Sequence, residues 1–564
     1  MSRKETKKET FMGAAAISTI GLIITRVISV VYIIPFNAMM TVKAFNVHNY
    51  AYTMFNQFYE LSLAGLPLAV ARLISMYNAK EQYKTSERVL KYAQRIMLFL
   101  GIVLAGIFFL IAKPYADFQF PGSDVEVVAD LTRSMRIIAP ALIVLPILSG
   151  MRGYLQGFMT VLGVSVSQVI ERIVFVIFLL AILFVTINTF NLQSQSAISY
   201  AFVALPIASL VAVFVLFPFY RKVRLEHAEL IKADTVSINT EANQLIKQII
   251  FTALPFVIAG LATTMYSGIT AFTFTKIRTF SGVATLIASV EYNIVSTFTN
   301  KLVSIPLTFS LALSTSIVSF ITNTYEAGDR KGTISYIKQS FRMIIFSTLG
   351  AVILMIIFGE PLLHFFYGRE GMNAEMLQAS IPFDVFKTTA NVLRVDGFRG
   401  VCLALETIAI SILQGVGKKE KAVLFTCTGP IAKLLLQFPL VYFFGLYGEI
   451  AATILGLLLS ICLSTREIMK TMEMKPKFIL VAVTKTLVAL LPIVISVSII
   501  NHVLISTFPI ILVNRVAALA YTAVFGLISL VLFLIAVEKV GMLKTIFGKN
   551  ITLVDLFSRY VLRK

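Results

Sequence analysis

Charged side chains inside long apolar segments are the residues of this sequence best placed to do chemistry. The clearest is Arg26, near the middle of residues 11–40, where about thirty apolar or small residues run almost without interruption. That run exceeds the roughly 20 residues a helix needs to cross a bilayer, and a charge at that depth costs roughly 2.5–3.5 kcal/mol. Because arginine stays protonated in proteins, Arg26 is expected to face a wet cavity or an anionic partner. It is either a snorkelling or ion-paired structural arginine or a contact for negatively charged cargo.

Other charges fall inside the apolar segments of both halves of the chain. The candidates for binding an anionic substrate are Arg26, Arg72, Arg152, Glu171, Arg172, Lys301 and Lys433. Arg72 and Arg152 are expected close to the cytoplasmic surface, where a snorkelling side chain is the alternative. Glu171 and Arg172 point about 100° apart on a helix, so they cannot both face one neighbour. A salt bridge between helical bundles is the alternative role for that pair.

Cations outnumber acids in these segments, which favours an anionic cargo. Arginine can bind two oxygens at once with its fork of donors, so phosphate groups are its natural partners. A cleft for cationic drugs would carry isolated carboxylates instead, and Glu60 and Glu406 keep that alternative open as sites of ion coupling. Apolar walls would tolerate a lipid tail left in the membrane.

The composition places these charges in a polytopic helical membrane protein. Of the 564 residues, 57% are hydrophobic and 14% are charged, against about 25% charged in soluble domains, and the mean hydropathy is +0.86. The net charge of +20 is expected to lie in cytoplasmic loops rather than to bind nucleic acid. Three cysteines without a CxxC spacing and four scattered histidines predict neither disulfides nor a metal site. No ATP-binding or catalytic motif stands in the sequence, so it predicts no enzyme and no cofactor.

Hydrophobic runs predict an all-α fold of fourteen membrane helices. Their expected ranges are 11–40, 48–76, 88–112, 133–157, 160–187, 196–220, 245–274, 285–322, 334–358, 388–415, 420–443, 447–471, 477–504 and 509–538. Basic residues concentrate in alternate loops, which predicts that both termini lie in the cytoplasm. The expected domains are an N-terminal lobe at 1–221, a cytoplasmic linker at 222–244, a C-terminal lobe at 245–471, two extra helices at 477–538 and a basic amphipathic tail at 542–564.

The two lobes repeat each other in sequence. The segment from Leu90 to Pro114 corresponds to the segment from Ile337 to Pro361 at an offset of 247 residues, and Leu155-Gln156-Gly157 corresponds to Leu413-Gln414-Gly415. Matches in the same order along both halves indicate a duplication. Because each copy holds six helices, the repeat is parallel, which is typical of transporters whose two bundles flank a central site.

Several motifs resemble the multidrug/oligosaccharidyl-lipid/polysaccharide exporter superfamily over nearly the whole chain. The resemblance is strongest to the Gram-positive branch of the MurJ-type lipid II flippases and polysaccharide transporters. The motifs are Thr25-Arg26-Val27-Ile28-Ser29, Ile34-Pro35-Phe36, Tyr50-Ala51-Tyr52, Ala64 to Arg72, Tyr77-Asn78-Ala79, Arg152 to Gly157 and Ser167 to Glu171. Arg26 falls on a family cavity arginine, and Lys301 falls where many relatives have arginine. Gram-negative members carry a second arginine six residues after the first, and here that residue is Tyr32.

This resemblance implies a two-lobed flippase of the bacterial cytoplasmic membrane that works by alternating access. Its cargo would be undecaprenyl-pyrophosphate-linked peptidoglycan precursor, lipid II, and its other contacts would be membrane lipids and cell-wall synthesis proteins. The last two helices would form a groove for the lipid tail. The alternatives are a flippase for another polyprenyl-linked oligosaccharide, from capsule, teichoic acid or spore wall, and an ion-coupled multidrug antiporter.

Overall fold

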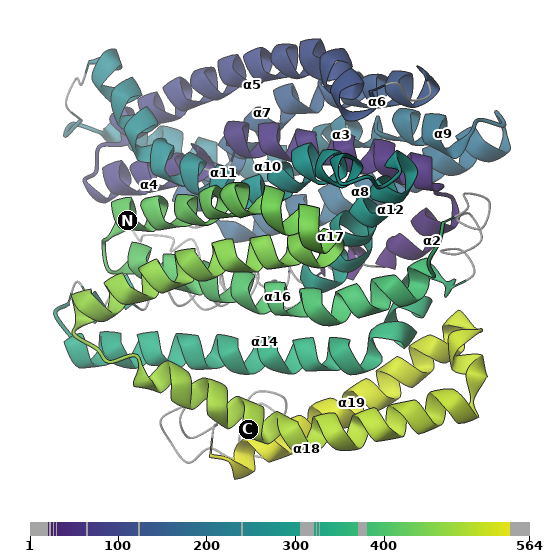
Figure 1. Cartoon of the computed structure of the whole chain (residues 1–564). Helices are drawn as coiled ribbons and strands as arrows, with labels where there is room; N and C mark the ends of the chain where they lie inside the picture. The colour runs from purple at the N-terminus through teal and green to yellow at the C-terminus, as the bar shows by residue number, and fades with distance from the viewer. Residues whose placement is uncertain are drawn as a thin grey trace. The chain divides into compact units, whose positions relative to one another are not determined.

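The computed structural model describes residues 21–541 apart from 22–23, 26, 30, 64–65, 122–124, 159, 238–240, 305–320, 323, 326 and 370–380. Across these residues the regular structure is helical, without a strand (Figure 1). Nine helices of the described part are long and apolar enough to cross a membrane. The all-α, polytopic fold predicted from the sequence is therefore confirmed. Arg26 and the tail at 542–564 lie outside the described residues.

The chain divides into two compact units, Met1–Phe272 and Thr273–Lys564. The helices of the first unit are α2 (Ile33–Ala38), α3 (Val42–Leu63), α4 (Leu66–Ala79), α5 (Tyr83–Gln119), α6 (Val125–Ile138), α7 (Ala141–Gly157), α8 (Val161–Asn188), α9 (Ser194–Ala201), α10 (Ala204–Ala233) and most of α11 (Ala242–Phe280). Within this unit α7 packs on α4, α5 and α10, and α8 packs on α10.

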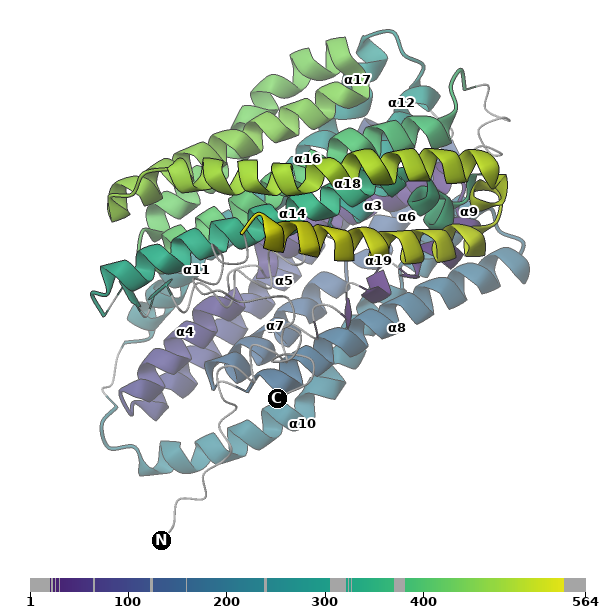
Figure 2. The same ribbon diagram turned by 90° about the horizontal axis from the view of Figure 1, so that it is seen from below.

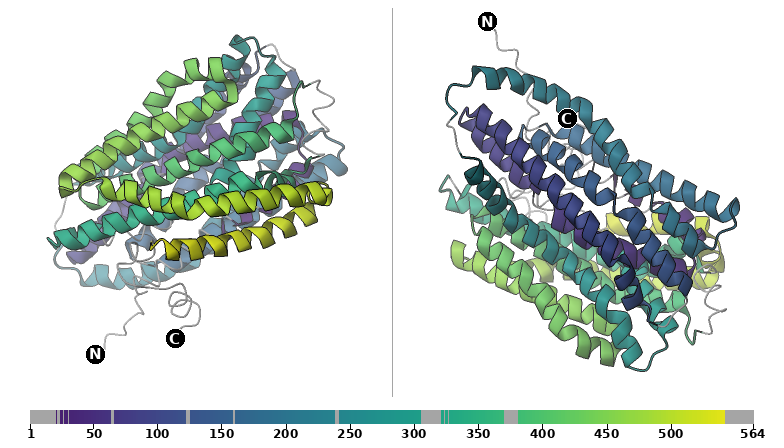
Figure 3. Two further views of the ribbon diagram at one scale, coloured as in Figure 1. Left: turned by 60° about the horizontal axis from the view of Figure 1, so that its bottom comes forward. Right: turned by 90° about the horizontal axis from the view of Figure 1, so that it is seen from above.

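The second unit begins with the end of α11. Its other helices are α12 (Thr285–Asn293), the π-helical η1 (Ile294–Thr299), α14 (Arg330–Tyr367), α16 (Val385–Gly415), α17 (Lys419–Met472), α18 (Lys477–Thr507), the 3-10 helix η2 (Pro509–Leu512) and α19 (Arg515–Lys539). Here α16 packs on both α14 and α17, while α18 and α19 pack on α14 and on each other. Figure 2 shows α18 and α19 running alongside each other, and they are the yellow pair in the left view of Figure 3.

In helix α5, the spacing of residues along the sequence determines which face is exposed and which face is buried. Phe99 and Leu110 are 70% and 74% exposed, whereas the opposite face is buried through Gly101, Leu104, Ala105, Phe108 and Ala112. These buried positions recur at intervals of three and four residues, as one stripe of a helix must. A row of exposed large apolar side chains would be a liability in water, and in a bilayer it contacts lipid. A Cβ at Gly101 would lie 2.7 Å from the Leu142 carbonyl oxygen, so glycine permits the close approach of α5 to α7.

The helix boundaries follow the internal repeat. Helix α5 begins at Tyr83 and α14 begins at Arg330, which is the 247-residue offset found in the sequence. Pro114 and Pro361 lie near the C-terminal ends of these two helices. Helices α7 and α16 end at Gly157 and Gly415, directly after the repeated glutamines.

Several expected helices differ in their ends. The helix expected at 133–157 is two helices, α6 and α7, because Pro140 has no N–H to donate. The helix expected at 196–220 divides into α9 and α10, and α10 continues to Ala233 through the first part of the expected linker. This extension forms because Val223 and His227 are buried on one face. The helices expected at 420–443 and 447–471 are the two arms of α17, which meet at Gly445 with a φ of 55°.

A short segment after α10 caps the N-terminus of α5. The backbone N–H of Lys84 donates to the Asp234 carboxylate at 2.8 Å, and the N–H of Thr85 donates to the Ser237 hydroxyl at 3.3 Å. The Ser237 hydroxyl also donates to Asp234 at 2.5 Å. Burial alone would raise the pKa of Asp234, but the hydrogen bonds from Lys84, Ser237 and Val236 outweigh it and hold this pKa well below its ordinary value.

We expect Asp234→Ala to lower the free energy of unfolding by about 1 kcal/mol, because the Lys84 N–H in the first turn of α5 loses its acceptor. An aspartate with a depressed pKa stabilises the fold above its unfolded pKa of about 3.9, and this stabilisation is lost as the pH falls through the folded value. The difference in melting temperature between the variant and the wild type in detergent should therefore shrink on acidification. Glu241→Ala, an exposed acid of the same segment, is the control. Equal melting temperatures for both variants at neutral pH would contradict this role of Asp234.

Candidate functional site

The first candidate, Arg26, lies outside the described residues, but the residues on both sides of it are helical. The Thr25 hydroxyl donates to the Gly21 carbonyl oxygen at 2.8 Å, and the Ser29 hydroxyl donates to the Thr25 carbonyl oxygen at 2.6 Å. Both hydroxyls are satisfied within their own helix.

In the first unit, the structure brings together two of the predicted residues, Arg152 and Glu171. The Arg152 guanidinium on α7 donates to the Glu171 carboxylate on α8 at 2.6 Å and to the Ser167 hydroxyl at 2.8 Å. Glu171 stands ten residues after the start of α8, roughly 15 Å along the helix at 1.5 Å per residue. Arg152 therefore reaches away from the end of α7 and toward the middle of the span, which differs from the surface position expected for it.

Arg152 keeps donor capacity beyond this ion pair. Its Nε atom is buried and has no hydrogen-bond partner among the described residues. Tyr59 and Glu60 on α3 belong to the same surroundings, because Tyr59 interacts electrostatically with Glu171, Arg152 and Glu60. We call Tyr59, Glu60, Arg152, Ser167 and Glu171 the arginine cluster. A guanidinium held by one carboxylate, with a donor left over, is suited to an additional anionic group.

Arg172 and Arg72 lie in other surroundings. The Arg172 guanidinium is 5.5 Å from the ring centroid of Tyr32 and 5.1 Å from that of Phe175, a range in which cation–π attraction operates. Glu171 and its neighbour Arg172 therefore contact different partners, as their angular separation on the helix requires. Arg72 on α4 is exposed, the arrangement expected of a side chain at the membrane surface.

A double-mutant cycle on Arg152 and Glu171 should reveal their coupling. Both side chains are mostly buried, with 12% and 24% exposed, so removal of either partner leaves the other poorly solvated. We expect Arg152→Gln and Glu171→Gln each to destabilise the chain, and a coupling energy of about 1–3 kcal/mol in the cycle. Unfolding in mixed micelles measures it. The same cycle on Arg172 and Glu171 is the control and should give a coupling near zero. Additive effects for Arg152 and Glu171 would show that the pair contributes nothing.

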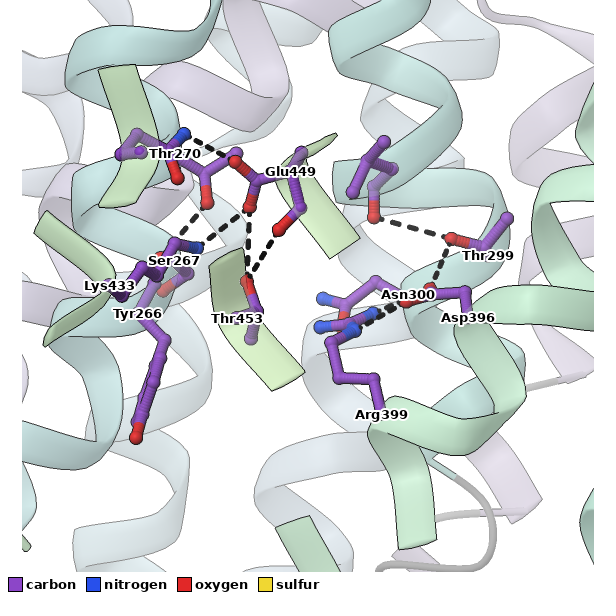
Figure 4. A network of polar contacts seen from close by, with 12 residues as sticks. Tyr266, Ser267, Thr270, Thr299, Asn300, Asp396, Arg399, Lys433, Glu449 and Thr453 are labelled. Atoms are coloured by element: carbon purple, nitrogen blue, oxygen red, sulfur yellow. Dashed lines mark hydrogen bonds and ion pairs between the residues drawn. The ribbon is translucent and has the colours of Figure 1, made fainter. Parts of the chain in front are cut away.

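In the second unit, Lys433 is enclosed with a carboxylate of the same helix. Its ammonium lies 2.7 Å from Glu449 (Figure 4), and only 1% of Lys433 and 2% of Glu449 are exposed. The Gln437 amide also donates to Glu449, and the Thr453 hydroxyl donates to the Glu449 backbone carbonyl at 3.0 Å. Lys433 is thus neutralised inside the unit, which differs from a cation presented directly to cargo.

A second buried ion pair lies in the same unit. Arg399 binds Asp396 with two hydrogen bonds of 2.6 and 2.8 Å, and the Thr299 hydroxyl donates to Asp396 at 2.7 Å (Figure 4). Arg399 also donates to the Asn300 side chain at 3.1 Å. Lys301 follows directly in sequence and is half-buried, and Glu406 is buried on α16.

The sequence did not identify Glu449 as the partner of Lys433, because the two residues are 16 positions apart along the chain. The signal that could have found it is Gly445, whose positive φ reverses the chain. The two arms of α17 then run close together, since a Cβ at Gly456 would lie 2.5 Å from the Gly429 carbonyl oxygen. A lysine and a glutamate on the facing sides of such a hairpin lie close enough to form a salt bridge, as Lys433 and Glu449 do.

The chemistry available in the described residues is that of ion pairs and hydrogen bonds. Within them there is no group of three or more histidine, cysteine or acidic side chains that could hold a metal ion. The three cysteines are free. The arrangement thus holds charged side chains in ion pairs inside apolar helical units.

Curated proteins of similar sequence come from Bacillus subtilis (strain 168). The chain is 29% identical over 445 residues to the lipid II flippase MurJ, which covers 78% of this chain and 79% of that protein. It is 22% identical over 483 residues to the stage V sporulation protein B, with 83% and 86% covered.

Solved structures with the same fold include two kinds of transporter. The structure titled lipid II flippase MurJ in an inward closed conformation matches with a TM-score of 0.65 at 13% identity, and covers 93% of this chain and 99% of that one. An inward-facing multidrug resistance MATE family transporter of the MOP superfamily matches with a TM-score of 0.60 at 13% identity, with 81% and 95% covered. At these identities the structures indicate the fold alone.

Family models match most of the chain in two pieces. The MatE model matches residues 292–443. The model described as polysaccharide biosynthesis protein matches residues 13–305, which is more than half of the chain and includes Arg26, the arginine cluster and Lys301. The chain is therefore a member of the polysaccharide biosynthesis protein family, within the superfamily that also holds the MurJ-type flippases and the MATE transporters.

Proposed function

We propose that this chain flips a polyprenyl-pyrophosphate-linked sugar precursor across the bacterial cytoplasmic membrane, and that lipid II is its cargo. The observation that carries the proposal is Arg152, a guanidinium inside a membrane-spanning unit with a buried donor still available. A pyrophosphate supplies the acceptor oxygens that such a donor requires. Support for lipid II comes from the relative in Bacillus subtilis named lipid II flippase MurJ.

In this mechanism Arg26 and Arg152 hold the pyrophosphate while the sugar crosses the membrane and the lipid tail stays within it. Glu171 keeps the Arg152 guanidinium oriented when cargo is absent. Lys301 is the proposed cation of the second unit. Helices α18 and α19 carry exposed apolar side chains such as Leu491 and Leu527, which is compatible with a groove for the polyprenyl tail. Both termini are expected in the cytoplasm.

Complementation tests the cargo. Cells depleted of their own lipid II flippase should regain growth and surface-exposed lipid II when they express this chain. An empty vector and an unrelated polytopic protein serve as controls. Absence of rescue with the chain present in the membrane at normal amounts would overturn the lipid II assignment.

A spore-wall or other polyprenyl-linked glycan is the second candidate, and the similarity to the stage V sporulation protein B favours it. The arginine cluster would bind the same pyrophosphate in that case, and the sugar alone would differ. Rescue of a strain that lacks this sporulation protein, without rescue of the flippase-depleted strain, would support the second candidate. The antiporter alternative predicts instead a drug-resistance phenotype that is lost in Glu60→Gln or Glu406→Gln.

A further inference from the structure

Helix α14 bends near its C-terminal end, just before Pro361. At Phe358 the helix is broken, with a φ of −98° and a ψ of 17°. Because proline has no N–H, the carbonyl oxygen of Ile357, four residues before Pro361, loses its usual helical donor. Only 5% of Ile357 is exposed, and a buried carbonyl without a partner destabilises a fold. This carbonyl oxygen therefore requires a donor from outside its own helix.

Helix α18 supplies that donor, and helix α19 orients it. The Asn501 side-chain amide of α18 donates to the Ile357 carbonyl oxygen at 3.1 Å. The Tyr521 hydroxyl of α19 donates to the side-chain oxygen of Asn501 at 2.7 Å, so the amide is held with its N–H groups toward α14. The Tyr521 ring also packs edge-on against Phe358, with centroids 5.9 Å apart. We call Asn501 and Tyr521 the asparagine latch.

Helix α19 contacts α14 on both sides of the bend. Before the bend, the Phe533 ring packs against Gly350, where a Cβ would lie 2.6 Å from it. After the bend, the Arg515 guanidinium donates to the Tyr367 carbonyl oxygen at 3.2 Å. Between these two contacts each helix covers roughly 26 Å. Because α19 is attached at both ends of this stretch, the bend of α14 cannot change unless α19 moves.

The internal repeat provides a natural comparison for this bend. It places Pro114 of α5 on Pro361 of α14, and Leu110 on Ile357. Helix α5, all of whose residues are described, continues through Pro114 without a break in its helical angles. It packs on α4, α6 and α7, whereas α14 packs on α18 and α19 (Figure 1). A proline at this position is therefore not sufficient to break the helix, and the break occurs in the copy that contacts the extra helix pair.

We propose that the asparagine latch holds α14 in its bent form, so that α18 and α19 together set the shape of the second unit. Straightening of α14 would pull the Ile357 carbonyl oxygen away from Asn501 and toward the ring of Pro361, where it finds no donor. A displacement of α18 or α19 would in turn release the carbonyl and loosen the bend.

The consequence for transport rests on the proposed function. If α18 and α19 carry the polyprenyl tail, a tail that displaces these helices would change the bend of α14 through the latch. Two states of one packed element are the physical basis of such coupling. The latch itself does not require that the cargo be lipid II.

Hydrogen–deuterium exchange of the purified full chain tests the latch at the bend. Asn501→Leu keeps a branched side chain and removes the donor, so exchange across residues 354–366 should become several times faster, because the helix opens there more often. Tyr521→Phe keeps the ring and should give a smaller increase. Ser496→Ala on α18 is the control and should leave exchange in α14 unchanged, since the Ser496 hydroxyl donates to the Pro492 carbonyl oxygen of its own helix.

Pro361→Ala determines whether Asn501 serves this particular carbonyl. Alanine restores an N–H that can donate to Ile357, so Asn501→Leu should change exchange little when it is added to Pro361→Ala. Pro114→Ala, the matched change in α5, should not rescue Asn501→Leu. If Asn501→Leu does not fold, Tyr521→Phe is compared in the same two backgrounds.

Two exchange results would overturn the proposal. One is an equal increase caused by Asn501→Leu with and without Pro361→Ala, and the other is unchanged exchange in both Asn501→Leu and Tyr521→Phe. In cells rescued by the chain, Asn501→Leu should lower surface-exposed lipid II several-fold at wild-type amounts of folded protein, and undiminished exposure would overturn the role of the latch in transport. The expected exchange pattern without rescue of any flippase strain would contradict the proposed function and leave the latch standing.

Discussion

Arg26→Ala is expected to abolish rescue of flippase-depleted cells while the chain remains in the membrane at wild-type amounts. Removal of one partner of a desolvated, hydrogen-bonded charge pair costs roughly 2–5 kcal/mol, which corresponds to about a thirtyfold to several-thousandfold loss of affinity for the pyrophosphate. The loss of a charge from an apolar segment should not harm membrane insertion, because alanine is easier to insert than arginine. Surface-exposed lipid II measured in intact cells reports the effect.

Two further variants make the Arg26 result interpretable. Arg26→Lys keeps the charge and loses the two-pronged donor geometry, so it should retain part of the activity. Lys222→Ala, which removes an exposed basic residue on α10, should leave activity unchanged. Full rescue by Arg26→Ala would show that this arginine is structural and would remove it from the binding site.

Lys433→Met is expected to have the largest effect on stability. The variant leaves the Glu449 carboxylate buried without its ammonium partner, and removal of one member of a buried pair costs roughly 3–5 kcal/mol. The double variant Lys433→Met/Glu449→Gln removes both charges and should recover most of that loss. Melting temperatures from size-exclusion chromatography of detergent-solubilised protein measure both variants.

The matched control for this second prediction is an ion pair on the same helix whose lysine is exposed. Lys421 and Glu467 lie 2.5 Å apart, and 44% of the Lys421 side chain is exposed. Such pairs contribute about 0–1 kcal/mol, so Lys421→Met should change the melting temperature little. If Lys433→Met were as stable as the wild type, Glu449 would have to be neutral in the folded chain.

Much of the fold could be predicted because membrane helices leave strong local signals. Long apolar runs predicted both helices, and the repeat between Leu90 and Ile337 predicted the 247-residue offset between the starts of α5 and α14, although each helix begins four or five residues earlier than expected. The ends of α10 were less predictable, since its polar extension is helical only through the burial of His227 and Val223 by tertiary contacts. Hydropathy predicts which residues contact lipid, but it gives little information about a polar helix that packs against other helices outside the lipid.

The candidate site was harder to predict than the fold. The sequence indicated Arg152 and Glu171 as separate candidates, but their pairing depends on which faces of α7 and α8 meet. Lys433 was predicted as a candidate for binding an anionic substrate. Its partner Glu449 was not predicted, because it lies on the second arm of a helical hairpin whose two arms hydropathy predicts as separate spans. The positions of charged residues can be read directly from the sequence. Which of them form ion pairs depends on the rotation of each helix about its axis, and a single sequence predicts that rotation poorly.

Reconstitution of the purified chain into proteoliposomes tests the central claim most directly. Lipid II is placed in one leaflet, and its appearance in the other is followed over time with a reagent that cannot cross the membrane. The wild type should transfer lipid II much faster than protein-free vesicles, and Arg26→Ala and Arg152→Gln should lower that rate strongly. Transfer by the folded wild-type chain no faster than by empty vesicles would contradict the assignment of lipid II as cargo.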